Sequence, residues 1–353
     1  MAQQASALTE WDVVVIGAGI IGCAVARELA RRGARTLVLE ARSVGAGATQ
    51  ASAGVLAPYI EAPSEGPLHA LAVQSLSLYD DFIASVARES NLPVEYRRCG
   101  TLEVAHDARA AAHLSALGAW IQSKGLEAEW IEPSRVSRIE SALAHTCGGL
   151  LVPSHGYVHA WQLTLALADA ARGHGAAVQV GCRVEEIRDE GDRSIVRAAD
   201  GVYRARAVVV AAGSWSSEIV PETSVGPIRG QLLRVRWEGP PIRRILWSEK
   251  CYLVPWLDGT LLVGATVEDV GFDERVTAGG VKTLLDAASE VLPGIADATF
   301  LDARVGLRPS TASGLPLIRR SAERPAVIYA TGHFRNGILL APLTASLVAD
   351  LIL

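Results

Sequence analysis

The sequence predicts an α/β fold in which a parallel-sheet domain is built from discontinuous segments, and a second, α+β domain is based on a mainly antiparallel sheet. Short β-branched runs at 12–16, 205–212 and 326–330 are typical of buried parallel strands. They lie near the start, the middle and the end of the chain. Between the last two, the strands of segment 231–266 are rich in Trp, Val and Leu, which favours an antiparallel sheet. The length of 353 residues also favours two domains over one core.

The chain opens with a strand, a helix and a second strand. After the strand at 12–16, residues 21–32 carry apolar side chains at helical spacing with charges on one side. Gly33 lies where a helix end needs a residue that tolerates a positive φ. The second strand covers 36–39 and is followed by Glu40. Further elements are expected as a strand pair at 95–105, strands at 176–180 and 183–187, and helices at 109–124, 163–172, 280–292 and from 336.

Composition excludes several classes of function. Half of the residues are apolar, a fifth are charged and the net charge is −5, which is typical of a soluble globular protein and argues against nucleic acid or an anionic membrane as partner. The five cysteines form no Cys-x-x-Cys pair, which indicates reduced thiols in a cytoplasmic protein without a metal site. The apolar run 13–26 is interrupted by three glycines and follows a segment without positive charge, so we expect neither a signal peptide nor a membrane span.

A dinucleotide-binding motif connects the first strand to the first helix. In Gly17-Ala-Gly19-Ile20-Ile21-Gly22, the first glycine allows the tight turn, the second admits a pyrophosphate and the third lets the helix pack on the strand. The helix N-terminus offers free N–H groups to phosphates. Glu40, 18 residues after Gly22, can accept hydrogen bonds from the ribose hydroxyls and disfavours the 2′-phosphate of NADP. The order of strand, glycine turn, helix, second strand and acidic residue predicts a Rossmann-type unit.

Further motifs resemble one flavoenzyme family. The small-residue stretch 45–55 looks like the flavin loop of the D-amino-acid oxidase superfamily, and Ala211-Ala-Gly213-Ser-Trp215 resembles its second flavin motif. Cys251-Tyr252-Leu-Val-Pro, Gly306-Leu-Arg308-Pro and Gly332-His333-Phe-Arg335-Asn-Gly337-Ile-Leu-Leu-Ala-Pro are similar to glycine oxidases of the thiamine-biosynthesis type. The resemblance covers nearly the whole chain. It implies non-covalent FAD, because no cysteine lies near Arg308, where related sarcosine oxidases attach the flavin.

The resemblance also implies roles for particular residues. Arg308 and Tyr252 would bind the substrate carboxylate, with Arg335 close to the substrate. The backbone of His333 would serve the flavin while its imidazole packs. The FAD site is predicted to consist of Gly17, Gly19, Ile20, Ile21, Gly22, Glu40, Ala41, Ala48, Thr49, Ala53, Gly54, Val55, Val184, Gly213, His333, Phe334, Arg335, Asn336, Gly337, Ile338 and Leu339. The FAD-binding domain is expected at 8–90, 145–225 and 303–353, and the substrate domain at 91–144 and 226–302.

The implied reaction is oxidative deamination of glycine or a similar small amino acid. A hydride passes from the α-carbon to flavin N5, the imine is hydrolysed, and oxygen is reduced to hydrogen peroxide. No protein base is required if the bound amine is neutral. The product would feed the synthesis of the thiamine thiazole, and the family implies a homo-oligomer, commonly a tetramer.

Some positions depart from the family pattern and leave the substrate open. Where relatives often carry an acid after Gly-Leu-Arg-Pro, this chain has Ser310 to Gly314; His159-Ala160 replaces a common Asp-Pro pair, and Val55 replaces a common Met. A D-amino-acid dehydrogenase or a sarcosine-type oxidase with another electron acceptor is therefore an alternative. A non-catalytic flavin subunit of a larger complex and an NAD-dependent dehydrogenase are others.

Overall fold

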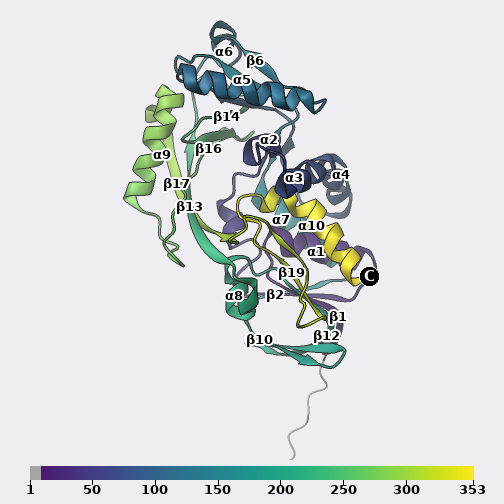
Figure 1. The fold of residues 1–353 in the computed structure, drawn as a ribbon. Coiled ribbons are helices and arrows are strands. Elements are labelled where there is room, and N and C mark those ends of the chain that lie inside the picture. The colour runs from purple at the N-terminus through teal and green to yellow at the C-terminus, as the bar shows by residue number, and fades with distance from the viewer. Residues whose placement is uncertain (1–8) are drawn as a thin grey trace, which may run out of the picture.

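The computed structural model describes residues 9–353 and contains two large sheets at opposite ends of the molecule (Figure 1). The first has the strand order β10-β11-β12-β1-β2-β9, and β19 pairs with both β12 and β18. Its parallel centre consists of β9 (Ala177–Val180), β2 (Thr36–Glu40), β1 (Thr9–Ile16), β12 (Gly201–Val210) and β19 (Val327–Thr331). The antiparallel members are β10 (Val184–Glu190), β11 (Arg193–Ala198) and β18 (Leu317–Arg320).

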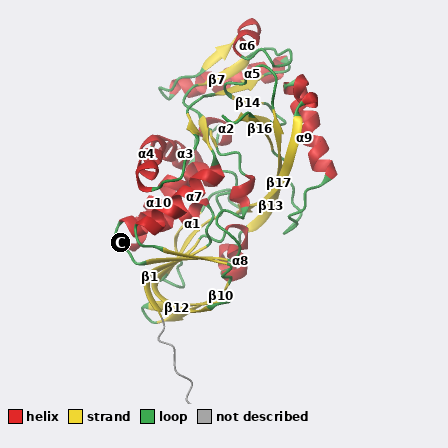
Figure 2. Cartoon of the chain, turned by 180° about the vertical axis from the view of Figure 1, so that it is seen from behind, coloured by secondary structure: helices red, strands yellow, loops and turns green. Residues whose placement is uncertain are grey.

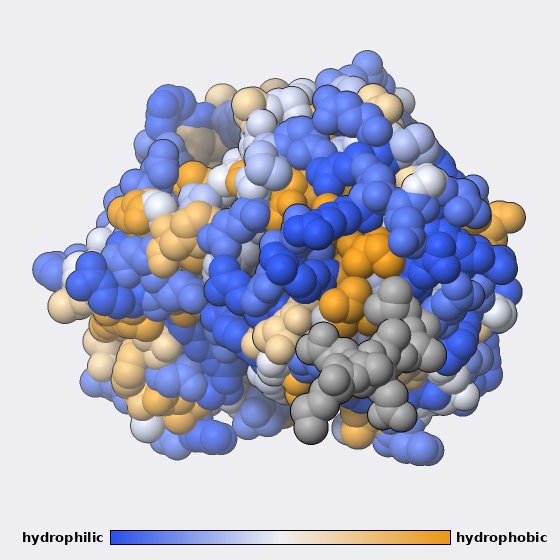
Figure 3. All heavy atoms as spheres, turned by 90° about the horizontal axis from the view of Figure 1, so that it is seen from below, coloured by the Kyte–Doolittle hydropathy of each residue, from blue (hydrophilic) through white to orange (hydrophobic). Residues whose placement is uncertain are grey.

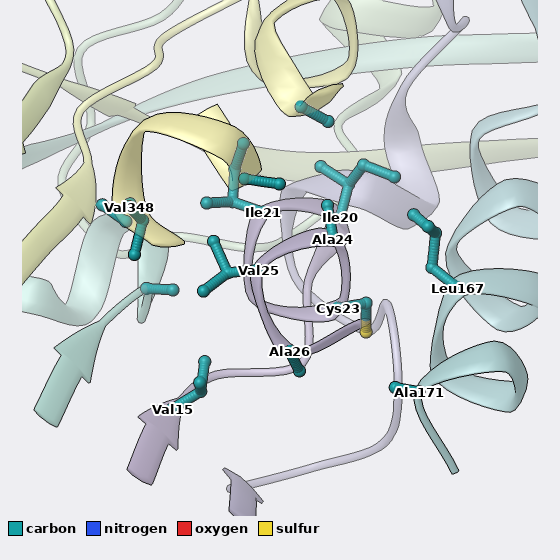
Figure 4. Close-up of a cluster of buried hydrophobic side chains, with 14 of the residues drawn as sticks. Val15, Ile20, Ile21, Cys23, Ala24, Val25, Ala26, Leu167, Ala171 and Val348 are labelled. Atoms are coloured by element: carbon teal, nitrogen blue, oxygen red, sulfur yellow. The ribbon is translucent and has the colours of Figure 1, made fainter. Parts of the chain in front are cut away.

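Helices distant in sequence cover one face of this sheet (Figure 2). α1 (Ile20–Arg31) lies between α7 (Ala160–Gly173) and α10 (Gly337–Ile352), and α3 (Pro67–Ser77) and α4 (Tyr79–Glu89) pack outside them. α1 is buried along almost its whole length, and Figure 4 shows its side chains meeting those of the neighbouring elements, with the labelled residues Val15, Leu167, Ala171 and Val348 around it. The small residues of α1 let the three helices approach closely.

The second sheet is antiparallel except for one strand pair. Its order is β17-β13-β16-β15-β14-β5-β7-β6, and only β14 and β5 run parallel. The strands are β17 (Thr299–Ser310), β13 (Gly226–Arg236), β16 (Thr260–Gly264), β15 (Tyr252–Pro255), β14 (Ile245–Trp247), β5 (Thr101–Val104), β7 (Gly149–Val152) and β6 (Glu129–Ile131).

Alternation along these strands directs side chains to both faces. Leu102 and Leu151 lie in the core under α9 (Ala278–Val291) and α6 (Pro133–Ile139), whereas Leu150 and Val152 lie in the core under α5 (Ala108–Ser123). Leu232 and Leu262, on β13 and β16 of this sheet, pack in one cluster with Tyr157 of β8 (Gly156–Val158). β8 pairs with β3 (Val55–Leu56) and β4 (Tyr96–Arg97) in a three-stranded sheet that joins the two ends of the molecule.

The predicted fold class is confirmed, and most predicted elements lie within a few residues of the observed ones. The sequence analysis did not predict α3 and α4, which follow a Pro/Gly-rich segment. The domain division remains a proposal. Two strands in segments assigned to the FAD-binding domain, β7 and most of β17, pair with β5 and β13 in the antiparallel sheet.

Seen from the end that holds β10 and β12, most of the surface is hydrophilic (Figure 3). Within residues 9–353, no helix has both the length and the hydropathy needed to cross a bilayer.

Two buried histidines should make stability depend on pH. His155 and His333 are almost fully enclosed, and burial lowers the pKa of each to about 3. In the unfolded chain their pKa is near 6.5, so below about pH 6.5 the unfolded chain binds more protons than the native protein. Stability that is fully present above pH 6.5 should therefore be lost as the pH falls toward 3, by about 1.4 kcal/mol per pH unit for each histidine.

Urea denaturation between pH 6.5 and 5 measures this loss. His155→Gln should reduce the slope of unfolding free energy against pH by about one proton, because Gln does not titrate. A slope equal to that of the unaltered protein would show that His155 is protonated in the native state.

Candidate active site

A deep cavity of about 680 Å³ lies between the two large sheets. Its outer part is bordered by the carboxyl ends of β1, β2, β12 and β19, where α/β sheets bind nucleotides. Its inner part is bordered by β13, β15 and β17 of the antiparallel sheet. A ligand in this cavity therefore contacts both halves of the protein.

The glycine motif forms the turn between β1 and the N-terminus of α1. Gly17 has a φ of 103°, and a Cβ atom there would lie 2.5 Å from the carbonyl oxygen of Ala211. A Cβ at Gly22 would lie 1.9 Å from the carbonyl oxygen of Gly17, so any side chain would force the helix away from the turn. Gly19 occupies the N-cap and borders the cavity with Ile20 and Ile21. The first turn of α1 thus lies beside the cavity, where its remaining free N–H groups can bind a ligand.

Two polar side chains hold this turn in shape. Glu40 accepts hydrogen bonds from the backbone N–H of Ala18 at 2.7 Å and of Arg42 at 2.8 Å, one at each carboxylate oxygen. Each oxygen retains acceptor capacity toward the cavity. Thr49, in the short helix η1 (Ala48–Ala51), accepts a hydrogen bond from Ile20 N at 3.2 Å, which leaves its hydroxyl proton free to donate. The site combines acceptors at Glu40 with donors at Thr49 and α1.

The loop before α10 closes the other side of the cavity. Phe334 has a φ of 49°, unusual for an aromatic residue, and its N–H donates to the carbonyl of Pro309 at 2.8 Å. The His333 imidazole is buried and lies 3.0 Å from the hydroxyl of Thr344, so it packs as predicted. The N-terminus of α10, at Gly337 and Ile338, opens into the cavity and can stabilise negative charge there.

Arg308 projects from β17 into the inner part of the cavity. Its Nη1 donates to the carbonyl of Thr266 at 2.9 Å and to that of Arg229 at 3.3 Å, which leaves Nη2 and Nε for a ligand. A side chain at Gly230 on the neighbouring strand would overlap the guanidinium. Burial, together with the nearby charge of Arg335, lowers the pKa of Arg308. No carboxylate of the described residues lies within 4.0 Å of this guanidinium.

Tyr252 on β15 faces the same space. Its ring stacks on Trp247 with a centroid separation of 4.9 Å, and Gly264 on the adjacent strand leaves room for it. Burial raises the pKa of the Tyr252 hydroxyl, so this group is protonated at neutral pH and can donate a hydrogen bond. Arg308 and Tyr252 together provide converging donors for an anion.

Arg335 lies at the edge of this space and has a carboxylate partner. Its Nη2 lies 2.6 Å from Oε2 of Glu61, the last residue of α2 (Pro58–Glu61). The Arg335 side chain is 40% exposed, whereas that of Glu61 is 10% exposed. Glu61 borders the cavity but was not predicted, because the short helix that carries it gives no recognisable motif.

The structure brings most of the predicted site residues around one cavity. Gly22, Asn336 and Leu339 do not line it: Gly22 packs on the turn, and Leu339 lies in the core beneath α10. Besides Glu61, the sequence analysis missed lining residues that end a strand or lie in the segment after one, among them Arg42, Cys182, Ala265, Val267, Glu274 and Thr331, and it quoted Ser214, Trp215 and Gly306 in motifs without assigning them to the site.

Comparison with known proteins identifies the family. A family model described as FAD-dependent oxidoreductase (DAO) matches residues 12–351. The chain belongs to this family of FAD-dependent oxidoreductases. The predicted resemblance, the enzymatic character and FAD as cofactor are thereby confirmed.

Relatives of this oxidoreductase include proteins named glycine oxidase. The chain is 34% identical to glycine oxidase of Geobacillus kaustophilus over 349 residues, which cover 97% of this chain and 93% of the relative. It is 35% identical to the bifunctional protein ThiO/ThiG of Nostoc, with coverage of 97% of this chain but only 52% of that protein. A crystal structure of glycine oxidase from G. kaustophilus superposes with a TM-score of 0.94 at 33% identity, covering 98% and 95% of the two chains.

FAD fits the donor and acceptor groups of the cavity in this oxidoreductase. The uncapped end of α1 and the Thr49 hydroxyl suit a pyrophosphate, and the two oxygens of Glu40 suit ribose hydroxyls. The small residues of 48–55 would border the flavin, with the N-terminus of α10 on its other side. We keep these individual assignments as proposals.

Glu40→Gln should weaken FAD binding about tenfold or more. The amide retains one acceptor oxygen, but it loses the charge and places an NH₂ group against one backbone N–H. Titration of the apoprotein with FAD, followed by flavin fluorescence, measures the affinity. Glu190→Gln, at the exposed end of β10, is the control and should bind FAD normally. Equal affinity in the two variants would place Glu40 outside the ribose site.

Acid precipitation of the purified protein should release all of its FAD into the supernatant. Cys251, adjacent to Tyr252, is buried, and burial raises its pKa, so it is a poor nucleophile for covalent attachment. Absorbance of the supernatant and the pellet at the flavin bands measures the release. Flavin retained in the washed pellet would contradict non-covalent binding.

Proposed function

We propose that this oxidoreductase catalyses the oxidative deamination of glycine or a similar small amino acid, with oxygen as the electron acceptor. The observation that carries the proposal is the partly buried guanidinium of Arg308, which has two free donor atoms and no carboxylate partner among residues 9–353. A cation that has lost much of its water and has no counter-ion is costly, so a site of this kind is complementary to an anionic ligand. The similarity to proteins named glycine oxidase supports glycine as that anionic ligand.

The carboxylate of an amino acid satisfies this arrangement. Nη2 and Nε of Arg308 form a planar fork that matches two carboxylate oxygens, and the protonated hydroxyl of Tyr252 can donate a further hydrogen bond. The two carbonyl groups that accept from Nη1 fix the orientation of the fork. The small-residue loop 48–55, where the flavin would lie, borders the same cavity as Arg308.

The chain contributes position and environment to the reaction. FAD, when bound, supplies the two-electron acceptor. Apolar groups of Val55, Ala265, Val267 and Phe334 border the cavity and limit the water around the reacting atoms. A water-poor pocket also favours the neutral form of the substrate amine, which is the form that can release a hydride from the adjacent carbon. The reaction therefore needs precise placement more than a strong base.

We propose further that the product supports thiamine synthesis. The basis is the similarity to bifunctional ThiO/ThiG proteins, of which this chain matches about half the length. We also propose that the protein forms a tetramer and is located in the cytoplasm.

Replacing Arg308 tests the proposal most directly. Arg308→Ala would leave the substrate carboxylate buried without its partner, and it should lower kcat/KM for glycine by a factor of hundreds to thousands, equivalent to about 3–5 kcal/mol. Arg308→Lys should recover only part of this loss, because an ammonium group cannot form the bidentate contact. A coupled peroxide assay over a panel of small amino acids measures the effect.

Two controls separate binding of substrate from support of the fold. Arg236→Ala, on the exposed part of β13, should leave kcat/KM and FAD content unchanged. The slow oxidation of an amine without a carboxylate should be nearly equal in Arg308→Ala and in the unaltered enzyme. If amine and amino-acid oxidation fall together, or if FAD is lost, Arg308 acts on the flavin or the fold and the substrate assignment is wrong.

A further inference from the structure

Glu61 carries a buried oxygen whose partner is an exposed ion-pair residue. Its Oε2 atom is enclosed and lies 2.6 Å from Nη2 of Arg335, in an ion pair that is not aligned as a hydrogen bond, and no other donor among residues 9–353 hydrogen-bonds to it. An enclosed acceptor without a donor is unfavourable, as is an enclosed charge without a well-formed partner. The oxygen therefore has capacity for a donor that the described chain does not supply.

The carboxylate of Glu61 lies in the part of the cavity where the substrate would bind. The carboxylate borders the same cavity as Arg308 and Tyr252 and lies close enough to interact electrostatically with both. Glu61 is held in place by α2, where its backbone N–H donates to the carbonyl of Ala57 at 3.0 Å and the preceding Tyr59 is fully buried. Arg335, by contrast, is 40% exposed and can withdraw toward solvent.

The charges around the cavity's inner end match those of an amino acid. Arg308 is positive and has no carboxylate partner, while Arg335 and Glu61 are of opposite charge. An amino acid arrives as a zwitterion, with a carboxylate for Arg308 and an ammonium group that binds first and passes one proton to a neighbouring acceptor before the neutral amine releases the hydride. Glu61 lines the cavity close to Arg308 and Tyr252, so its carboxylate can accept hydrogen bonds from that ammonium group.

We propose that Glu61 binds the amine of the substrate, which replaces the guanidinium of Arg335 as its partner, and so selects 2-amino acids over 2-hydroxy acids of the same size. The inference rests on the proposed function. A hydroxy acid can satisfy Arg308 and Tyr252 equally well, but its hydroxyl group brings no charge to Glu61. Glu61 thus discriminates between the two classes by the group on the α-carbon, whereas Arg308 recognises what they share.

Glu61→Gln tests this selection. It should lower kcat/KM for glycine at least about tenfold, the loss expected for one charge-assisted hydrogen bond. The affinity for glycolate, measured from the change in flavin absorbance on titration and as a competitive inhibition constant, should change by less than about twofold. Glu61→Asp, which keeps the charge on a shorter side chain, should lie between Glu61→Gln and the unaltered enzyme for glycine.

Glu65→Gln is the matched control, because Glu65 lies four residues further along, is exposed and pairs with Lys124 on the surface. It should leave both ligands unaffected. Arg335→Met distinguishes amine binding from simple support of Arg335: it should retain the preference for glycine over glycolate, which Glu61→Gln loses. FAD content and melting temperature, measured for every variant, identify any that fails to fold, and the Asp variant then supplies the comparison.

Two results would overturn the inference. One is an equal change for glycine and glycolate in Glu61→Gln, and the other is loss of the preference in Arg335→Met to the same extent. Failure of the proposed function has a different signature, since in that case the unaltered enzyme itself would oxidise neither glycine nor any other small amino acid.

Discussion

The guanidinium of Arg308 is held by the backbone carbonyls of Arg229 on β13 and of Thr266 just after β16, and it has no carboxylate partner among the described residues. Two features of the neighbouring strands accommodate the guanidinium. Gly230 provides the space beside it, and the long pairing of β13 with β17 fixes the carbonyl of Arg229 against its Nη1 atom. In the proposed function, the carboxylate of the substrate supplies the counter-charge that this guanidinium lacks.

The nucleotide half of the cavity follows a different physical principle. There the protein offers dipoles and neutral donors, at the N-termini of α1 and α10 and at Thr49, and the carboxylate of Glu40, whose oxygens are fixed by backbone N–H groups. Groups of this kind can bind phosphates and hydroxyls. In the function that we propose, this half of the cavity holds the nucleotide and the half around Arg308 holds the amino acid.

Local motifs made the nucleotide half predictable, since strand, glycine turn, helix and Glu40 are contiguous in sequence. Arg308 and Tyr252 were predicted by resemblance, because nothing local indicates that β15 and β17 bring them together. Glu61 was missed, as were α3 and α4, whose burial depends on contacts with distant segments. The His159 departure has a local explanation: its Nδ1 accepts from the N–H of Gln162 at 3.4 Å, so it caps α7 as an acid would.

The discontinuous construction of the parallel sheet bears on how the protein is made. β1 and β2 leave the ribosome first, but their neighbours β9 and β12 follow after more than a hundred residues, and β19 with α10 comes last. α10 packs against α1, so the first helix of the chain is covered only when the final segment has been synthesised. The nascent chain must carry an unfinished nucleotide cradle, with apolar surface uncovered, until β19 and α10 have been synthesised. The cradle can therefore close around a cofactor only after this segment has joined the sheet and the helices.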